Sequence, residues 1–176
     1  MYIANHGSCL SLPPKGSRLV AVVLGIGTQN YTCSSPHATP TPNGAIATLY
    51  DISCPVATVP RAAHYLSALA MEPGVHSGYP VASSMGYQKI GTHYFVPDGA
   101  VFEFNSNRKP FKFVGGRLEN ILAPSSSVKG SVDWLKLGIT KGLESQSRNV
   151  KVSTELRFVF TFELQFSVPD FFFFFF

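Results

Sequence analysis

Leu24–Cys33 reads L-G-I-G-T-Q-N-Y-T-C and combines more constraints than any other stretch of the 176-residue chain. It holds two glycines, an N-x-T glycosylation sequon at Asn30 and a cysteine. The run that leads into it, Leu19–Leu24, is apolar and rich in valine, which is typical of a strand buried on both faces. Glycines after such a run, here Gly25 and Gly27, usually mark a β-bulge or a close approach between two backbones. We therefore expect this strand to organise the fold.

The order of strand and then G-x-G is also how a dinucleotide-binding loop begins. That loop needs a third glycine and then a helix, but Asn30 stands at the third position. The residues that follow, Tyr31–Pro36, favour a strand and then a turn. Since no G-K-[ST] sequence follows either, the pattern predicts a glycine bulge rather than a nucleotide site, and we expect no cofactor.

The composition favours a β fold. Charged residues make up 14% of the chain, against about a quarter in an average domain, and 15 Gly and 13 Pro supply frequent turns. Ala45–Asp51 predicts a second strand with apolar residues on both faces, and Val132–Leu137 predicts another that carries the single tryptophan. Between Ile90–Val96 and Val101–Phe104 lies the turn sequence P-D-G-A, which predicts a β-hairpin.

One helix is expected, over Arg61–Glu72, because this stretch is rich in alanine and ends at a Pro-Gly pair. The sequences V-G-G at 114–116 and P-S-S-S at 124–127 predict breaks in the chain. The sequence as a whole predicts a mainly β domain over residues 12–156, an antiparallel sandwich or partly closed barrel with one short helix.

The two ends of the chain differ from this domain. Residues 1–11 are expected to be disordered and have no apolar core of the length that a signal peptide requires, so either the protein is not exported or its start is misassigned. From residue 157 onward the sequence alternates like a strand and ends in six phenylalanines. This Phe-rich tail, 157–176, is interpreted as a gene-model artefact in preference to a membrane-inserting tail.

Charge and hydropathy argue against a nucleic-acid partner and against a transmembrane helix. The net charge is +4, but the basic residues are scattered, and the densest group, Arg108–Arg117, is interrupted by a proline. A nucleic-acid partner would require clustered basic residues, so none is expected. The chain contains no apolar run of about 20 residues, so a transmembrane helix is not predicted.

The three cysteines are Cys9, Cys33 and Cys54. They lack the C-x-x-C spacing and histidine companions of a structural zinc site, so we expect no metal. A disulfide between Cys33 and Cys54 would close a loop of roughly twenty residues and add about 3 kcal/mol of stability. Together with the sequon at Asn30, it favours an oxidising, secretory route.

The candidate acid, base or metal residues are His93, Asp98, Asp51 and Glu103. The predicted hairpin brings Asp98 and Glu103 near His93. Because metal-binding and nucleophile-elbow sequences are missing, the favoured interpretation of His93 is structural, a histidine hydrogen-bonded within a strand.

Four motifs resemble a family of small, mostly secreted fungal proteins, the domain-of-unknown-function family 3455, which genome labels call malate dehydrogenase-like. They are, in chain order, G-T-Q-N-Y-T-C at 27–33, A-T-L-Y-D-x-S-C at 47–54, G-x-H-Y-F at 91–95 and V-D-W-L-K-L at 132–137. The resemblance implies an extracellular or cell-surface location. It carries over no catalytic residues.

The chain departs from the family pattern in three places. It lacks the signal peptide and the C-terminal segment with a further cysteine, which leaves Cys9 without an assigned partner. Thr92 stands where a second histidine is common. The dehydrogenase label is rejected, because that activity needs a doubly wound nucleotide domain and a second domain, which take far more chain.

Two functional hypotheses follow. The first is a secreted or cell-surface glycoprotein that binds a cell-wall polymer or small ligand without catalysis, with aromatic strands lining the site. The alternative is a small secreted enzyme using His93 with Asp98 or Asp51. A third interpretation is that the gene model encodes no stable protein.

Overall fold

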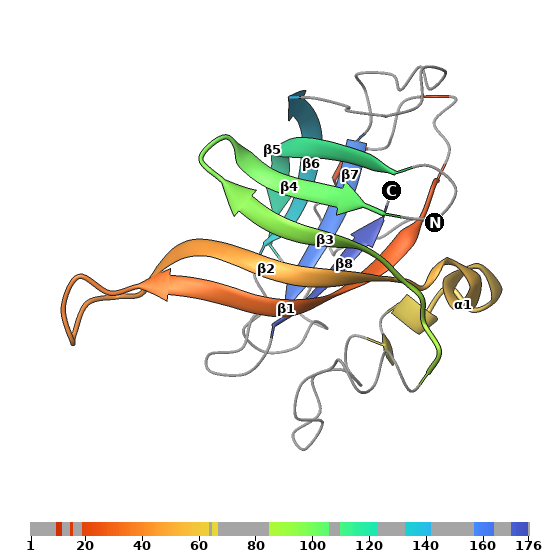
Figure 1. Ribbon diagram of the computed structural model, residues 1–176, viewed down its shortest axis with the longest axis horizontal. Helices are drawn as coiled ribbons and strands as arrows, with labels where there is room; N and C mark the ends of the chain where they lie inside the picture. The colour runs from red at the N-terminus through yellow and green to blue at the C-terminus, as the bar shows by residue number, and fades with distance from the viewer. Residues whose placement is uncertain are drawn as a thin grey trace.

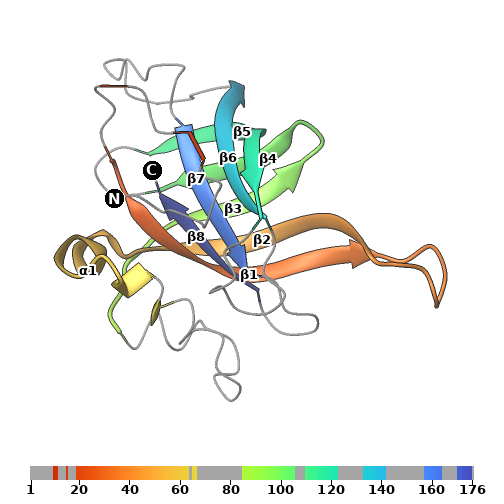
Figure 2. The ribbon, with the colours of Figure 1, turned by 180° about the vertical axis from the view of Figure 1, so that it is seen from behind.

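The computed structural model describes residues 10–11, 15, 19–63, 65–66, 85–105, 110–122, 133–141, 157–163 and 170–175. Its elements are, in chain order, β1 (Val22–Thr32), β2 (Thr41–Asp51), α1 (Ser53–Thr58), β3 (Lys89–Val96), β4 (Gly99–Phe104), β5 (Phe111–Ile121), β6 (Trp134–Lys141), β7 (Arg157–Glu163) and β8 (Asp170–Phe175). Strands β1 to β6 form an antiparallel half-barrel, and β7 and β8 close it by pairing between β6 and β1 (Figures 1 and 2). The predicted mainly β fold is confirmed, as a barrel rather than a sandwich.

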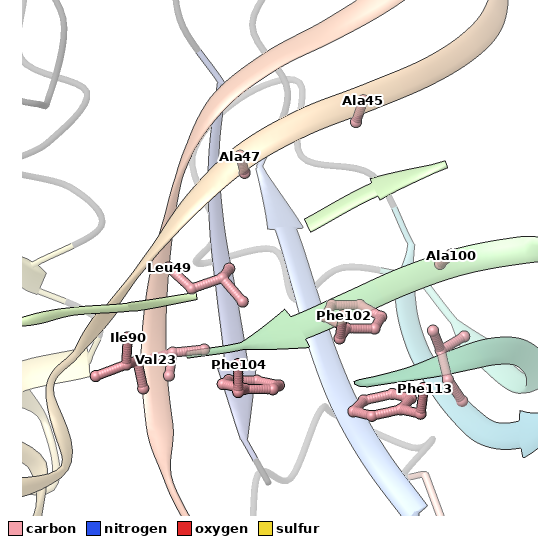
Figure 3. Close-up of a cluster of buried hydrophobic side chains, with 10 residues drawn as sticks. Val23, Ala45, Ala47, Leu49, Ile90, Ala100, Phe102, Phe104 and Phe113 are labelled. Atoms are coloured by element: carbon pink, nitrogen blue, oxygen red, sulfur yellow. The ribbon is translucent and has the colours of Figure 1, made fainter. Parts of the chain in front are cut away.

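Strand β1 is buried on both faces, as its valine-rich sequence predicts. Val23 points into the barrel, where it joins a buried cluster with residues of β2 to β6 (Figure 3). Val22, Leu24 and Ile26 lie on the outer face and pack against α1 and the residues near Ala63. The strand begins and ends later than predicted. Leu19 and Val20 are exposed, and β1 continues through both glycines to Thr32.

Gly27 marks a close approach between backbones, as expected. A Cβ at this position would overlap the carbonyl oxygen of Ile46 on β2. Three residues further on, Asn30 of β1 stands opposite two residues of β2, Asn43 and Gly44, where the register shifts. Gly44 has φ +97°, a left-handed conformation that glycine adopts without strain. The glycines therefore sit within paired strands and form no nucleotide-binding turn.

Strand β2 has buried apolar residues on both faces, as predicted. Ala45, Ala47 and Leu49 belong to the cluster inside the barrel, and Tyr50 belongs to the outer cluster under α1. Burial of the second face ends before Ile46, whose side chain is 60% exposed. The reason is that α1 covers only the end of the strand pair near Tyr50 (Figure 1).

The helix α1 comes earlier in the chain than the predicted one. Its first residue, Ser53, donates its backbone N–H to the carboxylate Oδ1 of Asp51 at 2.8 Å, and the N-cap residue is Ile52. The hydroxyl of Ser53 accepts the backbone N–H of Val22 at 2.9 Å and ties the helix to β1. Of the predicted helix, residues 62, 63, 65 and 66 are helical, and residues 64 and 67–72 lie outside the described residues. No helix in the described part of the chain is long and apolar enough to cross a membrane.

The predicted β3–β4 hairpin is confirmed, with Pro97 and Asp98 as a two-residue turn and Gly99 at φ +136°. The break predicted at 114–116 is wrong, because β5 runs through it to Ile121. Gly115 and Gly116 instead admit close neighbours from β6. A Cβ on Gly115 would lie 2.9 Å from Leu137, and the register shifts beside it. Glycine pairs here mark a bulge rather than the end of a strand.

The break predicted at 124–127 lies outside the described residues, as does Val132. The strand predicted over Val132–Leu137 is β6, which extends to Lys141. Residues 157–163 form strand β7, in which Phe158 and Phe160 pair with Leu137 and Leu135 of β6, and the interpretation of the tail as a gene-model artefact stays a prediction. The Phe-rich stretch therefore supplies the two strands that complete the barrel wall.

Candidate functional site

His93 lies inside the barrel, in the middle of β3. Its side chain is 1% exposed, and its Nδ1 atom is 2.9 Å from the backbone carbonyl oxygen of Val101 on β4. A carbonyl oxygen accepts hydrogen bonds and donates none, so Nδ1 carries the proton and donates it to Val101. The fold thereby fixes both the orientation and the tautomer of the ring.

His93 belongs to a continuous stack of rings on the inner faces of β3, β4 and β5, which we call the aromatic column. Side chains alternate between the two faces of a strand, so the pairs of one face line up across neighbouring strands. His93 pairs with Phe102, and Phe102 pairs with Phe113. The ring centroids of these two pairs lie 4.4 and 5.1 Å apart. The column consists of Phe95, His93, Phe102, Phe113, Phe104 and Phe111.

Burial in this column lowers the pKa of His93 to about 4, and the hydrogen bond to Val101 opposes the shift only in part. The imidazole is therefore neutral at physiological pH. A neutral ring also stacks on Phe102 without the cost of burying a charge. This agrees with the structural interpretation of His93 drawn from its sequence context.

We expect the stability of the protein to fall between pH 6.5 and pH 4 because of His93. In the unfolded chain the residue takes up its proton near pH 6.5, whereas in the folded chain it does so only near pH 4. The unfolded state therefore gains protons first as the pH drops, and about 3 kcal/mol of stability is lost over this window. Urea denaturation at stepped pH measures the loss.

A His93→Phe variant should remove that slope, whatever its stability at pH 7. A His37→Gln variant, which changes an exposed histidine in the β1–β2 turn, should keep it. If His93→Phe retained the wild-type slope, other groups would be its source.

Phe95 forms the solvent end of the aromatic column. Its ring stands edge-on to His93, with centroids 5.2 Å apart and the planes at 68°, and 45% of the residue is exposed. The base of the β1–β2 hairpin lies beside it, since a Cβ on Gly44 would be 3.6 Å from the Phe95 Cβ. The column thus holds one large apolar ring at the surface in a fixed position.

The two carboxylates proposed to act with His93 lie apart from it. Asp98 is exposed in the β3–β4 turn, about 15 Å along the hairpin from His93 at the usual rise of a strand. Asp51 lies at the end of β2, about 14 Å from Ala47, the residue that pairs with His93. Its carboxylate accepts the backbone N–H of Ser53 at the start of α1. The structure therefore does not bring His93, Asp98 and Asp51 together.

Glu103, the other candidate near His93, lies on the outer face of β4. Its Oε2 accepts a hydrogen bond from the Tyr94 hydroxyl at 3.2 Å and is 3.6 Å from the Lys112 ammonium. The pKa of Lys112 is raised, first by its own side-chain interaction with Tyr94 and further by the negative charge of Glu103. The barrel wall separates this exposed cluster from His93. Among the described residues, no group of three or more His, Cys, Asp or Glu is placed to hold a metal ion.

The predicted Cys33–Cys54 disulfide is wrong, since both cysteines are free and exposed. Cys33 follows the end of β1 where Thr32 pairs with Thr41, and Cys54 lies in α1, beyond the opposite end of the same strand pair. The strand pair holds the two cysteines about 30 Å apart, whereas a disulfide requires Cα atoms within about 7 Å. Cys9 lies outside the described residues.

Asn30, the sequon residue, is exposed on β1. The part of the β1–β2 hairpin beyond it projects past the rest of the barrel (Figure 1). The site is therefore open to a bulky modification.

A buried ion pair was missed by the sequence interpretation. Lys136 of β6 is 1% exposed, and its ammonium lies 2.7 Å from Oε1 of Glu119 on β5. Both also contact Ser11. The only signal in the sequence is a lysine between two leucines in V-D-W-L-K-L, which looks like the solvent face of an alternating strand. Lys136 also contacts Ser11, and strand periodicity does not reveal a contact between residues so far apart in sequence.

Comparison with known proteins gives one match. Residues 13–155 match the family described as protein of unknown function (DUF3455). This range includes all of β1 to β6 and precedes β7. No curated protein and no solved structure matches the chain. Since the match extends over most of the sequence, the chain belongs to the DUF3455 family of proteins of unknown function.

Proposed function

We propose that this protein is an exported fungal binding protein without enzymatic activity, which holds a cell-wall polymer or a small apolar ligand against Phe95. The observation that carries the proposal is the half-exposed Phe95 ring at the end of a column that is otherwise packed into the core. Its fungal and extracellular character rests on the resemblance of four sequence motifs to secreted fungal proteins.

Phe95 suits ligand binding because its side chain has little conformational freedom left to lose. Its neighbour His93 is fixed by the hydrogen bond to Val101 and by stacking on Phe102. A ligand that stacks on Phe95 therefore meets a ring that is already in place, which reduces the entropy cost of binding. The apolar C–H face of a sugar ring, or a flat apolar molecule, matches the face of an aromatic side chain.

Catalysis is the weaker proposal. The alternative, a small secreted enzyme using His93 with Asp98 or Asp51, requires an acid–base pair within hydrogen-bonding reach. His93 is instead buried and neutral at physiological pH. Asp98 and Asp51 both lie well beyond hydrogen-bonding distance from it. The fold also differs from that of a dehydrogenase, because an antiparallel barrel is not the doubly wound parallel sheet that binds a dinucleotide.

A Phe95→Ala substitution should weaken retention on the cognate polymer by at least about tenfold, which is typical of losing one aromatic anchor. The measurement is a sedimentation assay of purified full-length protein with insoluble chitin, β-glucan and cellulose. Tyr65→Ala is the matched control, since Tyr65 is also an exposed aromatic residue, at 61%, but lies outside the column.

Failure of the wild-type protein to bind any polymer or small hydrophobic probe would remove the proposal. Equal binding by Phe95→Ala and the wild type would move the site away from the column.

Export predicts a glycan at Asn30, in the only N-x-[ST] sequence of the chain. The intact mass of the native protein from culture medium should fall on endoglycosidase treatment, and Asn30→Gln should abolish the change. Asn43→Gln, in the same hairpin but outside a sequon, should leave the glycan in place. The same spectrum reports whether the natural C-terminus ends in the phenylalanine run. An unmodified chain found only inside cells would contradict export.

A further inference from the structure

The outer face of β5 and β6 carries a charge that is buried under another part of the chain. Leu135 and Leu137 face the barrel interior, so Lys136 between them faces outward. Its register partner on β5 is Glu119. The side chain of Lys136 is nevertheless 1% exposed, against 36% for Glu119. A buried ammonium requires close polar partners.

The polar partners of the Lys136 ammonium are Glu119 and the carbonyl and hydroxyl groups of Ser11. The Lys136 ammonium donates to the backbone carbonyl of Ser11 at 2.9 Å and to its hydroxyl. Glu119 Oε2 accepts the backbone N–H of Ser11 at 2.7 Å, and Oε1 accepts its hydroxyl. The pair thus contacts the N–H, the C=O and the side chain of a single residue. Such a set of contacts selects both a peptide backbone and a serine.

A further donor lies on the same face. Trp134 is two residues before Lys136 on β6 and so points to the same side, about 7 Å along the strand. Its indole N–H is buried, and no acceptor for it is found within the described ranges. An extended peptide that continues along β6 from the Ser11 position would offer carbonyl oxygens to this group.

We propose that Glu119 and Lys136, with Trp134 beside them, form a docking site for an extended peptide that carries a serine, and that the chain's own Ser11 is its resident occupant. The site is built before the peptide arrives, because cross-strand pairing of β5 and β6 sets the positions of Glu119 and Lys136. This proposal does not depend on ligand binding at Phe95.

The resident segment can be replaced. Ser11 is exposed on the outside of the barrel and is separated from its partner Glu119 by 108 residues of sequence. Attachment to the same chain keeps its local concentration high, so an external peptide competes poorly with it. Removing the Ser11 hydroxyl leaves Glu119 and Lys136 intact and shifts that competition. The lowered pKa of Glu119, about 2, is due first to Lys136 and then to Ser11, and keeps the pair charged at neutral pH.

The test uses the full-length chain and a fluorescein-labelled peptide, A-L-S-L-P-P-K, which is residues 9–15 with Cys9→Ala. Fluorescence anisotropy should show at least about tenfold tighter binding to the Ser11→Ala chain than to the wild type. Adding Lys136→Met to Ser11→Ala should abolish binding. The same peptide with its serine replaced by alanine should bind at least about tenfold more weakly.

Circular dichroism melting curves establish that each variant is folded. Should the Lys136→Met chain not fold, the serine and alanine peptides on the Ser11→Ala chain decide the question. Absence of binding by the serine peptide to the Ser11→Ala chain, or equal binding by both peptides, would overturn the proposal.

Discussion

Replacing Phe102 with alanine is expected to lower the free energy of unfolding by about 3–5 kcal/mol, the usual cost of removing a fully buried phenylalanine. Phe102 has no exposed surface and lies at the centre of the aromatic column, between His93 and Phe113. Its loss removes the stacking partner of His93 and leaves a cavity that rigid strands on both sides cannot close. Urea denaturation, followed by fluorescence of the single tryptophan, measures the change.

The matched control for Phe102→Ala is Phe95→Ala, at the solvent end of the same column. Phe95 is 45% exposed, so its truncation should cost roughly 1 kcal/mol. If the two variants lost similar amounts of unfolding free energy, the buried rings of the column would not be the main source of core stability.

Replacing Glu119 with alanine is expected to cost about 3–5 kcal/mol, because it leaves the buried Lys136 ammonium without its counter-charge. The two ends of the pair are not equivalent. Lys136 is 1% exposed, whereas Glu119 is 36% exposed and remains solvated when its partner is removed. Lys136→Met, which keeps the length of the apolar stem, should therefore change stability by only about 1 kcal/mol.

The double variant Glu119→Ala/Lys136→Met separates charge burial from loss of packing. It should recover most of the stability lost in Glu119→Ala, since no unpaired charge remains. If the double variant were as unstable as Glu119→Ala, the loss would come from packing at β5 instead.

Acid should release the same pair in its own pH window. Contacts with Lys136 and then Ser11 lower the pKa of Glu119 from 4.5 to about 2. The pair's contribution to stability is therefore complete above pH 4.5 and is lost as the pH falls toward 2. This window lies below that of His93, so a pH series distinguishes the two groups.

The parts of the fold that the sequence predicted are those with a strong local pattern. The continuous apolar run before Gly25 implied burial on both faces. In the structure one face of β1 packs into the barrel interior and the other packs against α1. The sequence P-D-G-A fixed the β3–β4 hairpin, because Gly99 tolerates the positive φ that the turn needs.

The misses share a physical origin in non-local contacts. Helix α1 is a six-residue segment, too short for helical periodicity, and its first residue, Ser53, is held by hydrogen bonds to Asp51 and to β1. The disulfide prediction failed because sequence separation says nothing of direction, and an antiparallel pair carries Cys33 and Cys54 to opposite ends. The burial of Lys136 depends on Ser11, 125 residues away.

The candidate site was predicted only in part. His93 was correctly interpreted as a hydrogen-bonded strand residue, with Val101 as its partner. The proximity of Asp98 and Glu103 to His93 along the hairpin was misleading, since alternation places Glu103 on the other face of the barrel wall and Asp98 in the turn. The aromatic column needs the register between β3, β4 and β5, which no single strand encodes.

The most direct test of this account is an NMR titration of the His93 imidazole in the folded protein, assigned with a His93→Phe variant. The account, in which His93 is a fixed part of the column that supports Phe95, predicts a pKa of about 4 and a neutral ring protonated at Nδ1. A pKa near 6.5 or above in the folded protein would contradict it. Such a value would mean a solvated imidazole, free to act as an acid or base, and would restore the enzymatic alternative.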